Sequence, residues 1–231
     1  MELESNVVLD LQLVQSNECG GSYHMELVGL KRMVAFFEDI LEIGTLVTDR
    51  HRQIAKWIRE NMPYTKHLYD IWHVAKCSLS AVKLEKLVTD IGKLSAVHQT
   101  SNVEGFHSLI IQFAPKCYVY SYTGMLCRTL LAGLHYNENA SRHTATTKAG
   151  EQRFKIRYPK YNAGGHVVKK ILVEATFSYV DDLMREVVDL CKKPSADRPV
   201  QLEEPPTLSS AMEKPDKAEA IKLHASRFKT K

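Results

Sequence analysis

Several sequence patterns that would assign a chemistry are missing from this chain. There is no GxSxG nucleophile elbow, no phosphate-binding P-loop and no HExxH zinc motif. The cysteines stand singly, so no CxxC pair of a zinc ribbon is present. The five are Cys19, Cys77, Cys117, Cys127 and Cys191. The familiar signatures of serine hydrolases, P-loop nucleotide-binding proteins and zinc proteins are therefore excluded.

Long apolar segments are also missing. No apolar run approaches the roughly 20 residues that a membrane span needs, so we expect no membrane partner. Residues 1–6 are acidic and poor in apolar side chains, which is not the pattern of a signal peptide. An odd number of cysteines without a secretory leader favours a reducing compartment. We therefore expect an intracellular protein, nuclear or cytoplasmic.

What is present is an ordinary globular composition. The chain has 231 residues, of which 44% are hydrophobic and 25% charged. This length allows one large domain, or one domain and a tail, with a core that needs no disulfide or metal. The net charge of +4 permits contact with nucleic acid but does not argue for it.

The first third of the chain has an alternating strand and helix pattern. Residues 7–14 alternate in polarity with period two, which predicts a half-buried strand. An apolar stripe predicts a helix over 22–41. A short β-branched run at 45–48, a helix at 52–61 and an extended run at 67–69 then predict a parallel strand pair. Asp49 and Asp70 follow these two strands, at the edge where such sheets collect their chemistry.

The rest of the chain is mainly helical. Residues 72–94 look helical but poorly patterned, and residues after 194 are rich in proline. Between and beyond them we predict helices at 101–113, 118–137 and 178–191, β segments at 153–158 and 167–173, and a short basic helix at 218–228.

Three carboxylates could carry chemistry, and each has a structural alternative. Asp49 lies beside His51 as a plausible metal ligand, or is the N-cap of the following helix. Asp70 and His73 are one helical turn apart and could share a metal, or be an N-cap and a core histidine.

The third carboxylate, Glu104, has His107 one turn further on. Ser101 and Glu104 have the spacing of a capping box, which needs no catalysis to explain it. The spacing alone does not decide between the cap and the site.

In their order along the chain, these segments resemble the ribonuclease H-like catalytic core of eukaryotic cut-and-paste DDE transposases. The matching blocks are residues 8–17, 45–51, 69–76, 98–108, 113–116, 124–127, 135–140 and 179–184, with a weaker echo at 219–228. Coverage runs from about residue 4 to residue 190. Each block alone is a weak signal, whereas the ordered series is specific.

The resemblance implies a role for the candidate residues. Such transposases hold two divalent ions, Mg²⁺ or Mn²⁺, with three carboxylates, and Asp49 and Glu104 match the second and third of them. Asp70 and His73 match the C/D-x-x-H signature that follows the second Asp. The resemblance also implies that DNA, or a related full-length transposase, could be a partner.

Two departures from the family pattern stand out. The family's first catalytic Asp precedes the strand at 7–14, so we expect the first strand of the core to be largely missing. Asp10 is a poor substitute, because it lies on the neighbouring strand. The large helical insertion of the family is replaced by about 20 residues between 76 and 98. We therefore expect a distorted, marginally stable sheet that can aggregate through unpaired edges.

The predicted fold is α/β: an incomplete ribonuclease H-like core followed by helices. We expect the truncated core over 1–143, its C-terminal extension over 144–192, and a disordered Pro-rich linker and basic tail over 193–231.

The predicted function is that of a catalytically inactive, transposon-derived protein, a degenerate DDE transposase with at most residual binding of DNA or a transposase partner. It would hold no tightly bound metal and no small-molecule cofactor. One alternative is an active metal-dependent nuclease or strand-transferase completed by Asp10 or by a partner chain. A second is a protein-interaction module unrelated to DNA.

Overall fold

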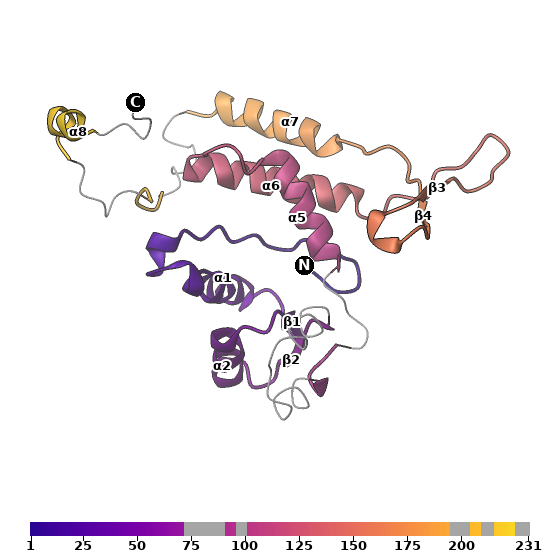
Figure 1. Cartoon of the computed structure of the whole chain (residues 1–231), viewed down its shortest axis with the longest axis horizontal. Helices are drawn as coiled ribbons and strands as arrows, with labels where there is room; N and C mark the ends of the chain where they lie inside the picture. Colours follow the sequence, from indigo (N-terminus) through magenta and orange to yellow (C-terminus); the bar gives the residue numbers. More distant parts are fainter. Residues whose placement is uncertain (72–90, 96–100, 195–203, 209–214, 225–231) are drawn as a thin grey trace, which may run out of the picture.

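The protein is a mixed α/β structure with two small sheets (Figure 1). The computed structural model describes residues 1–71, 91–95, 101–194, 204–208 and 215–224. Of the helix predicted at 72–94, only residues 91–94 are among the described residues. His73 lies outside them. Within the described ranges, no helix is both long and apolar enough to cross a membrane.

A parallel strand pair organises the N-terminal part, as the sequence predicted. Strand β1 (Thr45–Thr48) pairs with β2 (Lys66–Tyr69), and helix α2 (Arg52–Asn61) connects them. The two strands run in register from Thr45 opposite Lys66 to Thr48 opposite Tyr69. Ile54 and Ile58, one turn apart on α2, are both buried. Helix α1 (Ser22–Phe37) precedes the pair and ends four residues before the predicted limit at 41.

The predicted strand at 7–14 is wrong. This segment is assigned to no strand, although Val8 and Val14 are buried. Asn137 takes the place of a strand neighbour at Val8: its Oδ1 accepts from the Val8 N–H at 2.8 Å, and its Nδ2 donates to the Val8 carbonyl at 2.9 Å. The alternation predicts a strand from local sequence, but strand pairing depends on a neighbouring strand that local sequence does not specify.

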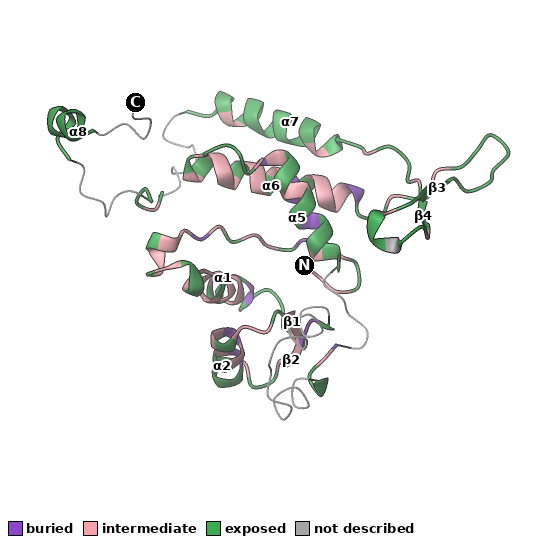
Figure 2. Ribbon diagram, viewed as in Figure 1, coloured by how far each residue is buried: buried purple, intermediate pink, exposed green. Residues whose placement is uncertain are grey.

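Two packed helices form the centre of the described structure. Helix α5 (Ser101–Phe113) lies against α6 (Tyr122–Asn139), and their contact holds the core cluster of Val8, Phe106 and Ala132. Helix α6 begins at Tyr122 and not at 118, because Ser121 caps it by accepting from the Gly124 N–H at 3.1 Å. Buried residues are few and are concentrated at this contact and around β2 (Figure 2).

An antiparallel ribbon and two further helices complete the described chain. The ribbon pairs β3 (Phe154–Arg157) with β4 (Val167–Lys170), and a short 3-10 turn, η2 (Lys160–Asn162), lies between them. Helix α7 (Ser178–Lys192) then returns along α6. Helix α8 (Lys217–Leu223) has Asp216 as its N-cap. A further 3-10 turn, η1 (Ser16–Glu18), precedes α1. These elements confirm the later helix and strand predictions with small shifts in their limits: α7 ends one residue later than predicted, and β3 and β4 are shorter. The predicted end of the last helix, at 228, lies outside the described residues.

Candidate functional site

The carboxyl ends of the parallel strands carry the two predicted aspartates. Asp49 directly follows β1, and Asp70 directly follows β2. The Thr48 hydroxyl donates to the Asp49 carbonyl at 2.9 Å. Nε2 of His67 lies 2.9 Å from the same hydroxyl oxygen. Because the hydroxyl proton is already used, Nε2 of His67 must be the donor, which fixes the tautomer of that ring.

The surroundings of His67 favour the neutral form of its ring. Burial lowers the pKa of its imidazole, and the nearby Lys93 ammonium lowers it further. A neutral ring with its proton on Nε2 can donate to the Thr48 hydroxyl oxygen. His67 therefore stiffens the end of the sheet where Asp49 leaves β1.

Asp49 and Asp70 point to different environments. Asp70 is 1% exposed, and its N–H donates to the Thr48 carbonyl at 3.1 Å. Asp49 is exposed and lines a cavity of about 770 Å³ that Asp70 does not line. The structure therefore separates the two strand-end aspartates, one inside the fold and one facing an open cavity.

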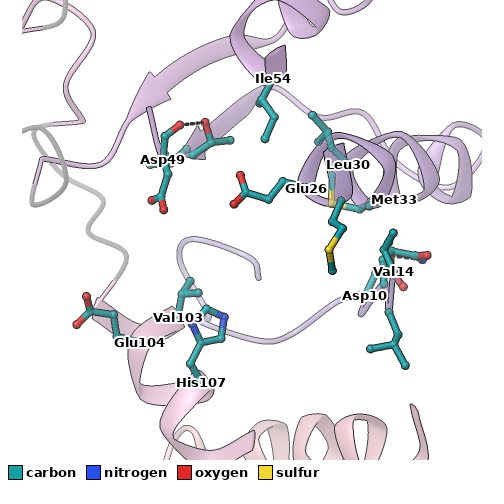
Figure 3. Close-up of a pocket in the computed structure, with 16 residues that line it drawn as sticks. Asp10, Val14, Glu26, Leu30, Met33, Asp49, Ile54, Val103, Glu104 and His107 are labelled. Carbon is teal, nitrogen blue, oxygen red and sulfur yellow. Dashed lines mark hydrogen bonds between the residues drawn. The ribbon is translucent and has the colours of Figure 1, made fainter. Parts of the chain in front are cut away.

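The cavity lies between four parts of the chain (Figure 3). One wall is the extended segment from Asp10 to Val14, and the opposite wall is the end of β1. Met25, Leu30 and Met33 of α1 supply an apolar side, and α5 closes the cavity with Val103, Glu104 and His107.

Four carboxylates from four different elements line this cavity: Asp10, Glu26, Asp49 and Glu104. In Figure 3 the carboxyl groups of Glu26 and Asp49 extend from opposite walls toward the hollow. His107, one turn after Glu104, projects into the same space from α5. The cavity therefore joins Asp49, Glu104 and His107, which the sequence singled out separately, with Asp10.

Glu26 was not singled out from the sequence. It lies on the same face of α1 as Leu30 and Met33, four and seven residues further on, and these also line the cavity. The sequence signal for Glu26 is a charged residue within the apolar stripe of the helix predicted at 22–41, and the helix prediction does not use it.

His51 does not line the cavity. It is the N-cap residue of α2, without a capping bond from its side chain, and its ring lies 4.7 Å from the Tyr23 ring. Its Nδ1 atom is buried and has no hydrogen-bond partner in the described part of the chain. Since His51 holds the cap position, the alternative of Asp49 as the N-cap is wrong.

The capping-box alternative at Glu104 is not tested, because the residue before Ser101 lies outside the described residues. Ser101 is the first described residue of α5. Glu104 is exposed in the first turn and faces the cavity region. The positive end of the helix dipole favours a carboxylate at this position, which does not require a catalytic role.

The arrangement does not fit a two-ion centre. Among the described residues, no three His, Cys, Asp or Glu side chains lie close enough together to hold a metal ion. Two-metal chemistry needs ions about 3.5–4 Å apart with shared carboxylate ligands. The four carboxylates surround a wide cavity and do not converge on one point, so they do not form such a centre.

Comparisons with known proteins give no match. A scan against protein-family models, a search of curated proteins and a search of solved structures each found nothing similar to this chain.

Proposed function

We propose that this chain is a transposase-derived protein with an incomplete ribonuclease H-like core, that it does not cut DNA, and that it retains binding of nucleic acid or of a related transposase. One observation carries the proposal. Asp49 at the end of a parallel strand and Glu104 in the first turn of a later helix line the same cavity. The two residues lie 55 positions apart in sequence, and the resemblance pairs them as catalytic equivalents.

The positions of the four carboxylates support the loss of cutting activity. The carboxylates come from α1, α5, the end of β1 and an extended segment held by Asn137. Closing a two-ion site would require these elements to converge, and the cavity of about 770 Å³ between them would have to collapse. We therefore assign the cavity no catalytic role. A nucleic-acid partner would place the protein in the nucleus.

A nicking assay tests this proposal. Supercoiled plasmid is incubated with the full chain in Mg²⁺ or Mn²⁺, alongside the Asp49→Asn/Glu104→Gln double variant and an unrelated nuclease as positive control. We expect equal background from wild type and variant. Nicking by the wild type that the double substitution abolishes would overturn the proposal.

The second candidate function is an active metal-dependent nuclease completed by Asp10. The observation in its favour is that Asp10 lines the same cavity as Asp49 and Glu104. Its carboxylate accepts from Nε2 of Gln12 at 2.8 Å, which holds it on the opposite wall. If this candidate is correct, Asp10→Asn alone abolishes nicking, whereas Asp39→Asn, an exposed aspartate just after α1, leaves it unchanged.

A further inference from the structure

Positive charge is concentrated in one short part of the chain. Residues 142–170 contain eight Lys and Arg side chains and a single acidic one, Glu151. Their formal charge is +7 against +4 for the whole protein, so the remaining residues together carry −3. The modest total therefore conceals a strongly basic segment in an otherwise acidic chain.

The fold places this segment on a two-stranded antiparallel ribbon. Strands β3 and β4 pair Lys155 with Lys169 and Arg157 with Val167. Residues before β3 extend the ribbon, since the Arg153 N–H donates to the Ala145 carbonyl at 2.9 Å and the Ala145 N–H to the Ile171 carbonyl at 2.7 Å. Figure 1 shows the ribbon beyond the ends of α6 and α7, and none of its residues lines the acidic cavity.

Four basic side chains of the ribbon share a face. Successive side chains of a strand alternate between faces, so Arg153, Lys155 and Arg157 lie on one side with Lys169. Every side chain of β3 is exposed. Side chains two residues apart are about 6.8 Å apart, close to twice the 3.4 Å rise per nucleotide of one DNA strand.

This charge is not neutralised within the described structure. None of the ion pairs among the described residues involves a ribbon side chain. Like charges directly opposite one another in an antiparallel pair destabilise the sheet, and Lys155 opposite Lys169 is such a pair. An arrangement that costs stability in the free protein is relieved by an anionic partner.

Two exposed aromatic rings lie in the connection that follows β3: Tyr158 is 71% exposed and Tyr161 85%. Phe154, 50% exposed, pairs with Lys170 and lies on the opposite face of the ribbon. Aromatic rings next to Lys and Arg are the combination that binds nucleic acid, because the cations contact phosphates while the rings stack on bases. An antiparallel β-ribbon also fits the major groove of a duplex.

We propose that the β3–β4 ribbon is a nucleic-acid-binding surface, in which Lys155, Arg157 and Lys169 contact the phosphate backbone and Tyr158 and Tyr161 stack on unpaired bases. The inference deepens the nucleic-acid part of the proposed function. It does not depend on the acidic cavity.

The test measures binding of a short labelled oligonucleotide, as single strand and as duplex, over a series of salt concentrations. The ribbon variant is Lys155→Gln/Arg157→Gln/Lys169→Gln. The control variant, Lys31→Gln/Arg59→Gln/Lys116→Gln, removes the same charge from exposed positions elsewhere. We expect the ribbon variant to bind on the order of tenfold more weakly at low salt, and its slope of log K against log salt for the duplex to fall by about 3. The control keeps the wild-type slope.

A second variant separates stacking from charge. Tyr158→Ala/Tyr161→Ala should weaken single-strand binding on the order of tenfold and leave the salt slope unchanged. Far-UV circular dichroism of each variant confirms that the fold is retained.

Three results would overturn the inference: a ribbon variant that binds as wild type does, a control variant that loses as much as the ribbon variant, or wild-type binding to phosphatidylserine vesicles but to neither oligonucleotide. Each is distinguishable from failure of the catalytic proposal, which the nicking assay alone decides.

Discussion

Asn137 ties the extended N-terminal segment to α6. Its amide bonds both the N–H and the carbonyl of Val8, which is 9% exposed and belongs to the core cluster with Phe106 and Ala132. The same residue therefore replaces a strand neighbour for the extended segment that forms one wall of the acidic cavity.

Replacing Asn137 with Ala should destabilise the protein by about 2–4 kcal/mol, because two backbone groups lose their partners at about 1–2 kcal/mol each. Urea denaturation followed by circular dichroism measures this free energy of unfolding. Asn61→Ala, at an exposed asparagine that ends α2, is the control and should cost less than about 1 kcal/mol. Equal losses from the two variants would show that Asn137 does not hold the segment.

Two helical glycines give a second comparison at this scale. A Cβ added at Gly105 on α5 meets nothing within 4 Å, whereas one added at Gly133 on α6 meets Cδ1 of Leu11 at 2.9 Å. Gly105→Ala should therefore stabilise the protein by about 0.5–1 kcal/mol through helix propensity alone. Gly133→Ala should give no gain, since Leu11 must move. A full gain at Gly133 would mean that Leu11 does not pack against α6.

At the scale of elements, α7 is attached through its first turn. The Glu138 carboxylate of α6 accepts from the Ser178 N–H at 2.9 Å, the Ser178 hydroxyl at 2.8 Å and the Tyr179 N–H at 2.9 Å. It thus supplies the cap that α7 lacks from its own N-cap residue, Phe177. A hydrogen bond from Thr176, together with those from Tyr179 and Ser178, lowers the pKa of Glu138 to about 2.

The docking of α7 should consequently depend on pH. A carboxyl with a depressed pKa contributes stability that is present above its unfolded value of 4.5 and is lost as pH falls toward about 2. We expect the protection factor of the first turn of α7, which compares its hydrogen-exchange rate with that of an unstructured chain at the same pH, to fall over this interval in the wild type. In Glu138→Gln the protection should be low at every pH, whereas Glu186→Gln, exposed on α7, should follow the wild type. A protection factor that does not change between pH 5 and pH 2.5 would contradict the role given to Glu138.

The sequence predicts helices and strands correctly where periodicity and local caps agree. Helix α2 lies at 52–61 as predicted, because its two core residues are one turn apart and Pro63 follows closely. The strand-end position of Asp49 and the first-turn position of Glu104 followed from the same local signals. The partners of residues 7–14 did not, because strand pairing is a contact between distant segments. Asn137, which bonds Val8 instead, lies 129 residues further along the chain.

At the scale of the whole molecule, the described residues bury few hydrophobic side chains. Nine hydrophobic side chains are buried in the described residues, and four of them are Val8, Phe106, Ala114 and Ala132 around α5 and α6. Large apolar side chains remain exposed on α7, including Met184 at 60% and Val187 at 54%. The sequence alone shows that residues 142–170 are strongly basic, which the total charge hides, and the fold places these residues on a ribbon.

We predict marginal stability for the isolated chain. Thermal unfolding followed by circular dichroism should be broad, with a low midpoint and aggregation on heating, because little apolar surface is buried and short sheets leave edges open. An oligonucleotide that binds the ribbon should raise the midpoint by mass action. A sharp, cooperative transition at high temperature without any ligand would contradict this prediction.

The claim that this chain does not assemble a catalytic centre is tested most directly by locating manganese in its crystals. Crystals soaked in Mn²⁺ give an anomalous signal at each bound ion. We predict no closely spaced pair of ions between Asp49 and Glu104. Two fully occupied ions about 3.5–4 Å apart, held by this chain alone, would contradict it.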